Sequence, residues 1–190
     1  MPADLPLLEC PDREAWADWL AEHCESSAGV WLKLARKGGG RSVTYAEALD
    51  VALCHGWIDG QKGAIDERHW RQRFTPRGPR SRWSKRNRRR AEELIASGDM
   101  TPAGLREVEA ARADGRWEAA YDSPATAEVP ADLQAALDAD PAAREFFAGL
   151  DRANRYAILY RLQEASRPET RARRLATFVT MLREGRRIHE

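Results

Sequence analysis

The sequence contains little cysteine and no long apolar segment. Its 190 residues include 3 cysteines, Cys10, Cys24 and Cys54, and no two of them have the CxxC spacing. An odd number of scattered cysteines argues against a disulfide framework or a zinc knuckle and favours a reducing compartment. No run approaches the roughly 20 apolar residues that span a bilayer. Residues 1–14 lack the basic and apolar regions of a signal peptide. We therefore expect a cytoplasmic protein without membrane insertion.

The common catalytic and nucleotide-binding motifs are also missing. The patterns GxSxG, HExxH, GxGxxG and the P-loop do not occur, and no GK[ST] follows the glycine run at residues 38–40. His55, Asp59, Asp66 and His69 carry atoms that ligate metals, but their spacing matches no familiar ligand pattern. The sequence therefore predicts no metal site and no cofactor.

Acidic residues are absent from one long segment, residues 68–90. This segment contains ten arginines and one lysine, although the whole chain has a formal net charge of only +1. The remainder of the chain is therefore acidic overall. Such a split indicates one local anionic partner and not a uniformly basic nucleic-acid coat.

The first part of the chain predicts a small antiparallel sheet packed by helices. Asp12 is a typical N-cap for a first helix, and the residues from Thr44 to Glu47 form a capping box for a second. Strands are expected at residues 30–34, 57–61 and 69–74, and the last two are expected to pair as an antiparallel hairpin. Alternation in the third strand places Trp70, Gln72 and Phe74 on one face and Arg71 and Arg73 on the other.

The second part of the chain predicts helices only. A helix is expected at residues 84–98 and another from Pro102 to about Gly115, and further helices open at Asp140, Asp151 and Pro168. The predicted class is α+β and helix-dominated, with a helical C-terminal part. A linker near residue 125 divides the chain into residues 1–125 and 126–190, which form either two subdomains or one continuous domain.

Charge, aromatic rings and hydroxyl groups converge at residues 57–90. Arginine offers a planar fork of donors that matches phosphate or carboxylate. An exposed tryptophan can stack on a base, and the helix that begins near Ser84 presents free N–H groups to an anion. The candidate ligand-binding residues are Trp57, Arg73, Thr75, Arg77, Ser81, Arg82, Trp83, Ser84 and Asn87.

Each of these features also has a purely structural interpretation. Trp57 fits the core, Ser84 is a suitable N-cap, and residues 86–90 are typical of a solvated helix face paired with following glutamates. Asp59 is the nearest acid, and two roles are open for it. It can pair with Arg73 across the hairpin, or it can act as a general acid or base.

Several ordered motifs resemble the YdeI/OmpD-associated, or bacteriocin-protection, family of bacteria. The resemblance extends from about residue 16 to about residue 187. It is carried by residues 52–59, 73–77, 81–87, 98–104, 114–117 and 167–174. The resemblance implies a bacteriocin-protection-type protein and supplies no catalytic mechanism or cofactor. His55 stands where the family usually has a large apolar residue, so no catalytic role is implied for it.

Three functions are compatible with these observations. The first is a binding module for a phosphate-bearing ligand, either a nucleotide or a nucleic acid, at residues 73–87. The second is an enzyme that acts on a phosphorylated small molecule with Asp59 as acid or base. The third is a structural or interaction protein in which the arginines pair with acidic residues of the same chain. The oligomeric state is not predicted.

Overall fold

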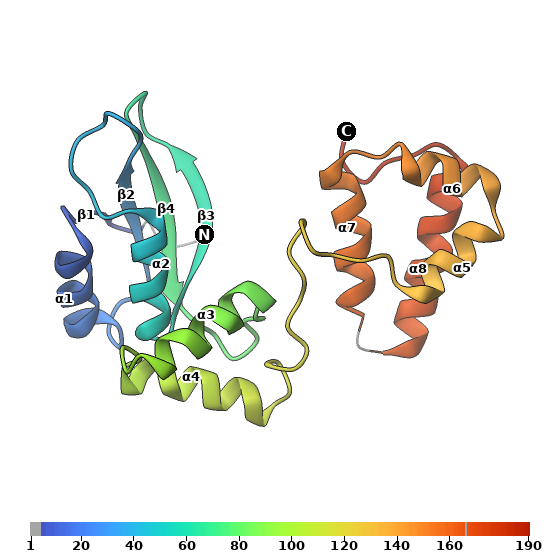
Figure 1. The fold of residues 1–190 in the computed structure, drawn as a ribbon. Helices are drawn as coiled ribbons and strands as arrows, with labels where there is room; N and C mark the ends of the chain where they lie inside the picture. The colour runs from blue at the N-terminus through green and yellow to red at the C-terminus, as the bar shows by residue number, and fades with distance from the viewer. Residues whose placement is uncertain (1–4, 166) are drawn as a thin grey trace. The chain divides into compact units, whose positions relative to one another are not determined.

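The computed structural model describes residues 5–165 and 167–190. The chain forms two compact units, which we call unit 1 (Met1–Trp83 and Asn87–Ala120) and unit 2 (Ser84–Arg86 and Tyr121–Glu190). Unit 1 contains a sheet and helices, and unit 2 is helical (Figure 1). The predicted helix-dominated α+β class is confirmed.

Unit 1 is built on a four-stranded sheet in the order β1-β2-β4-β3. Its strands are β1 (Leu7–Glu9), β2 (Val30–Ala35), β3 (Trp57–Ala64) and β4 (His69–Pro76). The antiparallel hairpin of β3 and β4 is confirmed, and β2 pairs antiparallel with β4. The sheet is mixed, because β1 pairs parallel with β2. A strand of three residues is too short to show a period in the sequence, so β1 was not predicted.

Four helices pack around this sheet or next to it: α1 (Arg13–His23), α2 (Tyr45–Cys54), α3 (Lys85–Ala96) and α4 (Pro102–Ala113). Asp12 caps α1 by accepting a hydrogen bond from the backbone N–H of Ala15 at 3.0 Å. Thr44 and Glu47 form the expected capping box at the start of α2. Gly56 ends that helix with φ +73°, a conformation that glycine adopts without strain.

Helix α2 lies between two apolar cores. On one side, Trp16 of α1 and Leu32 and Phe74 of the sheet pack against α2, and all three are fully buried. On the other side, Leu53 of α2 packs with Trp83 and with residues of α3 and α4. This arrangement explains why almost every position of α2 is apolar, whereas α1 has a single apolar stripe. The sheet therefore has one face covered by α1 and α2.

Unit 2 contains α5 (Ala131–Asp138), α6 (Pro141–Ala148), α7 (Arg152–Gln163) and α8 (Pro168–Arg183) around one core. The helix starts predicted at Asp140, Asp151 and Pro168 are confirmed. The short helix α5 was not predicted, because Pro130 precedes it and offers no side-chain cap. Arg171 joins three helices: it donates two hydrogen bonds to Asp132 of α5 and one to the Leu162 carbonyl of α7.

Among the described residues, no helix combines the length and the apolar character that crossing a bilayer requires.

Candidate functional site

The sheet of unit 1 has a second face, which points away from α1 and α2. Residues that are directly opposite one another on paired strands point to the same face. The pairs Trp31↔Arg73 and Lys33↔Arg71 therefore share this face, and Ile58↔Thr75 extends it onto β3. We call it the outer face. It consists of Leu7, Glu9, Trp31, Lys33, Ile58, His69, Arg71, Arg73 and Thr75.

A tryptophan and two arginines form the centre of the outer face. The Cζ atom of Arg71 lies 4.4 Å from the centroid of the Trp31 ring, within the range of a cation–π contact. Arg73 is the direct cross-strand neighbour of Trp31. The Nε atom of Arg73 is buried and has no hydrogen-bond acceptor within the described parts of the chain.

Two glycines of β3 make room for these arginines. A Cβ atom at Gly63 would lie 3.1 Å from Nε of Arg71, and one at Gly60 would lie 3.8 Å from Cβ of Arg73. The arginine stems therefore lie close against β3. On the opposite face, Gln72 fixes the same region, because its buried amide donates to the carbonyls of Gly60 at 2.8 Å and Gln61 at 3.2 Å. The register shift between Asp59 and Lys62 occurs at this point.

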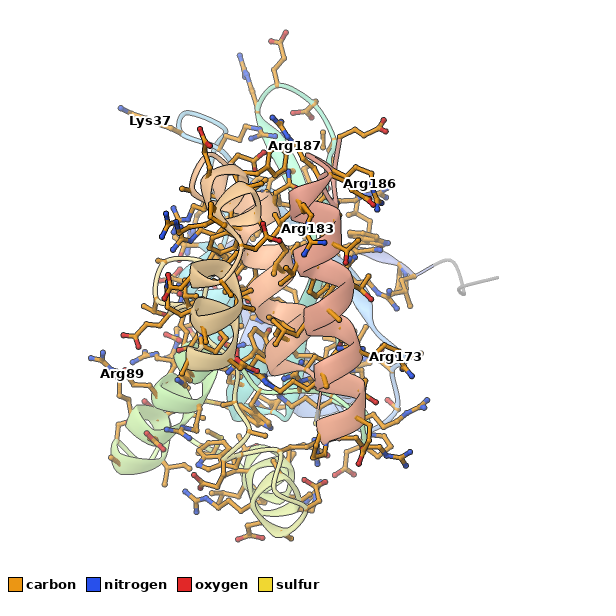
Figure 2. The ribbon with its side chains drawn as sticks, turned by 90° about the vertical axis from the view of Figure 1, so that its right-hand side faces the viewer. Lys37, Arg89, Arg173, Arg183, Arg186 and Arg187 are labelled. Atoms are coloured by element: carbon orange, nitrogen blue, oxygen red, sulfur yellow. The ribbon has the colours of Figure 1, made fainter. Side chains whose placement is uncertain are left out.

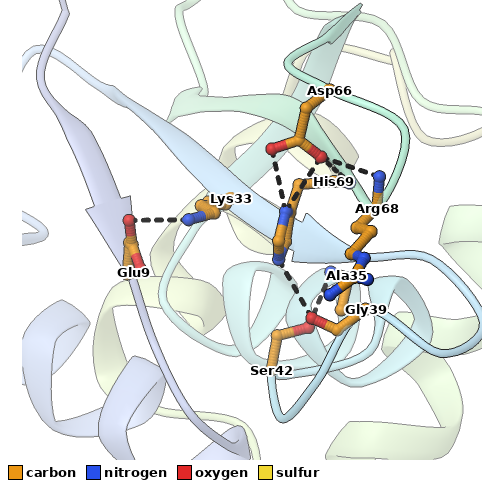
Figure 3. Close-up of polar contacts among 8 residues, drawn as sticks. All are labelled: Glu9, Lys33, Ala35, Gly39, Ser42, Asp66, Arg68 and His69. Carbon is orange, nitrogen blue, oxygen red and sulfur yellow. Dashed lines mark hydrogen bonds and ion pairs between the residues drawn. The ribbon is translucent and has the colours of Figure 1, made fainter.

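One end of the outer face carries a network around His69 (Figure 3). The Nδ1 atom of His69 lies 3.0 Å from Oδ1 of Asp66, and its Nε2 atom lies 3.0 Å from the carbonyl oxygen of Gly39. Asp66 also accepts the backbone N–H groups of Arg68 and His69. The hydrogen bond from His69 is the main reason why the pKa of Asp66 lies below its usual value. The network ties the β3–β4 turn to the glycine loop after β2.

A small cavity opens beside this network. Its volume is about 180 Å³, and it is lined by Glu9, Cys10, Lys33, Arg41, Ser42 and His69. The Nζ atom of Lys33 lies 3.0 Å from Oε1 of Glu9, and Ser42 accepts the backbone N–H of Ala35 at 2.8 Å. Cys10 is buried, and burial raises the pKa of its thiol to about 11.

The predicted residues Arg77 and Trp83 lie in the interior of unit 1. Arg77 is 6% exposed, and its Cζ atom lies 3.5 Å from the centroid of the Trp83 ring. Trp83 is 1% exposed and packs edge-on against Trp117. Arg77 also donates to the carbonyl of Arg82 at 3.3 Å. Trp83 therefore has no exposed ring face on which a base could stack, and Arg77 supports the loop from within.

Ser81 closes the turn between β4 and α3. Its hydroxyl accepts the backbone N–H of Gly78 at 2.9 Å, and its own N–H donates to the Gly78 carbonyl at 2.9 Å. Arg116 donates to the Ser81 carbonyl at 2.9 Å. Of the remaining predicted residues, Asn87 is buried, and Trp57 is buried with its indole N–H donating to the Cys24 carbonyl. These side chains have structural partners, whereas Arg73 and Thr75 lie on the outer face.

The first turn of α3 has backbone partners of its own. Ser84 forms an isolated parallel bridge with Tyr121, and the Lys85 N–H donates to the Tyr121 carbonyl at 2.8 Å. Lys85 also forms an ion pair with Asp122 at 2.8 Å. The Lys85 N–H, one of the groups expected to face an anion, therefore already donates to a backbone carbonyl.

The later arginines of α3 pair with acids close to them. Arg90 binds both carboxylate oxygens of Asp50 at 2.6 Å, and Arg89 lies 3.2 Å from Glu93. Arg88 donates to the Trp117 carbonyl and lies 3.7 Å from Glu118. These contacts agree with the interpretation of residues 86–90 as a paired helix face. The paired acids belong to α2, to α3 itself and to the segment after α4.

Asp59 points toward the inner face of the sheet. It is opposite Phe74, and the Tyr45 hydroxyl of α2 donates to its Oδ2 atom at 2.7 Å. Arg73 points to the outer face, and the expected Asp59–Arg73 ion pair is absent from the described residues because alternation along the strands separates the two side chains. Within the same residues, no cluster of three or more His, Cys, Asp or Glu side chains is arranged to hold a metal ion.

Unit 2 carries a second group of exposed arginines. Arg183, Arg186 and Arg187 lie at the C-terminal end of α8 and just beyond it (Figure 2). Arg183 pairs with Asp140, and Arg186 pairs with Glu184. Cations at the end of a helix also complement its dipole. Arg183 and Arg186 are therefore explained without a ligand.

Of the central residues of the outer face, the sequence predicted only Arg73 as a ligand-binding residue. The alternation of Arg71 and Arg73 was visible, but the weak period at residues 30–34 did not identify Trp31 or Lys33 as their neighbours. Only the register of β2 against β4 places these four side chains together.

Comparison with known families divides the chain in two. Residues 126–185 match the family described as Bacteriocin-protection, YdeI or OmpD-Associated, which confirms the resemblance for this part of the chain. The motifs at 52–59, 73–77, 81–87 and 98–104 lie instead in a region, residues 8–107, that matches a domain of unknown function, DUF8412. No curated protein and no solved structure matches the sequence. The DUF8412 match covers more than half of the chain, so the chain belongs to the DUF8412 family.

Proposed function

We propose that this chain is a bacteriocin-protection-type protein of bacteria that binds single-stranded nucleic acid on the outer face of its sheet. The match at residues 126–185 supports the first part of this proposal. The second part rests on one observation, the placement of Arg71 over Trp31 with Arg73 as the next cross-strand neighbour. This is an anion-binding function, as residues 68–90 suggested, but its centre lies on the strands and not in the loop at 77–87.

The chemistry of the outer face suits a nucleic-acid strand. Bases stack on aromatic rings, and phosphates are neutralised by arginine and lysine. Trp31 supplies the ring, and Lys33, Arg71 and Arg73 supply three cations, whereas Glu9 is the only acid among the residues that define the face. Arg71 and Arg73 are two residues apart on one strand, about 7 Å at their backbones. They can therefore contact separate phosphates.

An enzyme that uses Asp59 is supported less well. Asp59 accepts a hydrogen bond from Tyr45 and lies on the covered face of the sheet. It does not line the cavity beside His69, and it does not line the shallower hollows that border α1, α5 and α6. Its position is that of a residue that joins α2 to the sheet.

The proposal is tested by fluorescence anisotropy with a labelled single-stranded oligonucleotide at several salt concentrations. Log affinity should fall linearly with log salt, and each of Arg71→Gln and Arg73→Gln should reduce the slope by about 0.7. Trp31→Leu should weaken binding by roughly 5- to 150-fold, the equivalent of about 1–3 kcal/mol for a lost stacking contact. Trp31→Phe should restore much of it.

Arg89→Gln is the matched control, because Arg89 is an exposed arginine that pairs with Glu93 on α3. It should leave affinity and salt slope close to those of the wild type. Absence of binding at low salt would refute the proposal, and so would Arg71→Gln and Arg73→Gln variants that bind like the wild type.

A further inference from the structure

The cavity beside His69 has the size of a small anion. Its volume of about 180 Å³ is below the roughly 300–1,000 Å³ of pockets that hold drug-sized ligands. Lys33, Arg41 and His69 line it from β2, from the loop before α2 and from β4. Lys33 and His69 also belong to the outer face (Figure 3). The cavity therefore lies at one end of that face.

The two partners of the Lys33–Glu9 ion pair differ in their exposure to solvent. The Lys33 side chain is 24% exposed, whereas its partner Glu9 is 67% exposed on a short edge strand. An ion pair near the surface contributes only about 0–1 kcal/mol, so an incoming anion can replace its carboxylate. The carboxylate of Glu9 thus lies next to Lys33, where an anion of higher charge would bind.

The other lining groups already have ion-pair or hydrogen-bond partners. Arg41 pairs with Asp12, the N-cap of α1, and remains 77% exposed. The two nitrogens of His69 face Asp66 and the Gly39 carbonyl, both hydrogen-bond acceptors. The Ser42 hydroxyl is already used, since it accepts from Ala35 and donates to the Val43 carbonyl. Lys33 and Arg41 are therefore the cationic side chains that can contact an anion in the cavity, and His69 forms part of its wall.

We propose that this cavity binds a phosphate monoester, which displaces Glu9 and is held by Lys33 and Arg41. A phosphate monoester carries a charge of about −1.5 to −2 at neutral pH and so competes well with a single carboxylate. The inference rests on the proposed function, because it identifies the ligand as the terminal phosphate of a strand that lies along the outer face. A free phosphate has the same chemistry, and the test separates the two sources.

The first part of the test uses inorganic phosphate alone, titrated into the full-length protein and followed by chemical shifts of backbone amides. Shifts should concentrate at residues 9, 33, 41 and 69. Glu9→Gln removes the competing carboxylate and should tighten phosphate binding by about two- to fivefold, a gain that damage to the fold cannot produce. Lys33→Gln should weaken it by about tenfold. Glu67→Gln and Lys37→Gln, exposed changes of the same types on nearby loops, should have no effect.

The second part compares a 5′- or 3′-phosphorylated oligonucleotide with the same sequence ending in hydroxyl groups. One phosphorylated end should bind more tightly, and Lys33→Gln should abolish the difference. If inorganic phosphate leaves the cavity residues unchanged in both wild type and Glu9→Gln, the cavity site is refuted. Phosphate binding without any gain from a terminal phosphate refutes the strand-end assignment. Phosphate binding without any oligonucleotide binding refutes the proposed function and leaves the cavity site standing.

Discussion

Arg77 shows how a cation from a basic segment becomes part of a core. Arg77 is 6% exposed, and its guanidinium is stacked on Trp83. Lysine lacks the planar group that makes this contact, so we expect Arg77→Lys to lower the free energy of unfolding by about 1–2 kcal/mol. Urea denaturation measures this. Arg80→Lys is the control, because Arg80 is exposed on the same loop. If Arg77→Lys unfolds like the wild type but binds oligonucleotides less tightly, Arg77 contacts the ligand after all.

His55 provides a pH dependence with a defined sign. Burial lowers the pKa of His55 below its usual value, because the charged imidazolium is poorly solvated there. The folded state therefore binds fewer protons than the unfolded state. The stability contribution is fully present above the unfolded pKa of about 6.5 and is lost as the pH falls through the folded value.

The effect of His55 is measured by urea unfolding at pH 8 and pH 5.5. The wild type should lose more stability between these two values than His55→Gln does. His189→Gln, at an exposed histidine near the C-terminus, should keep the slope of the wild type. If stability falls equally with pH in the wild type and in His55→Gln, burial of His55 is not the source of the pH dependence.

The sequence identifies the basic residues but does not separate those with structural roles from those on a surface. Arg73 and Arg77 look alike in the sequence, yet one lies on the outer face and the other is stacked inside unit 1. The difference depends on Trp83 and Trp117, whose contact joins positions 34 residues apart in the chain. Patterns along the chain carry no information about such contacts.

At the level of elements, α2 and α4 approach one another at a glycine. A Cβ atom at Gly104 would lie 2.3 Å from the Cys54 carbonyl oxygen, which already accepts a hydrogen bond from the Thr101 hydroxyl. We expect Gly104→Ala to force the helices apart and to lower the free energy of unfolding by about 1–3 kcal/mol. Thermal or urea unfolding measures the change.

Gly149→Ala is the matched control for this prediction. Gly149 ends α6 with φ −83°, and a Cβ atom there would have no heavy atom nearer than 3.6 Å. This change should be neutral or slightly stabilising, since alanine restricts the unfolded chain more than glycine does. If Gly104→Ala is as stable as Gly149→Ala, then α4 can shift away from α2 without lowering the free energy of unfolding.

Elements with local signals were predicted, and those without them were missed. Asp12, Thr44 and Asp140 each cap the helix that the sequence assigned to them. Helix α5 begins after Pro130 without a side-chain cap, and β1 has only three residues. The parallel pairing of β1 with β2 joins segments on either side of α1. No short-range pattern could indicate it.

At the scale of the whole molecule, the two family matches correspond to the two units. Residues 8–107 fall in unit 1 except for 84–86, and residues 126–185 fall in unit 2. The resemblance read from the sequence extended over both units, and the family match confirms it for the second. The motifs of unit 1 reflect its own core and loop geometry, as the roles of Trp57, Arg77 and Trp83 show.

The two edges of the sheet have a consequence for assembly between copies of the chain. An open edge strand is a template for pairing with a strand of another molecule, and this leads to aggregation. Here β1 is only three residues long, and the longer edge strand β3 is interrupted by an irregular register between Asp59 and Lys62 and carries an exposed lysine there. Irregular pairing and edge charges both disfavour the addition of a further strand. The sheet can thus present a face to a ligand while its edges resist fibril growth.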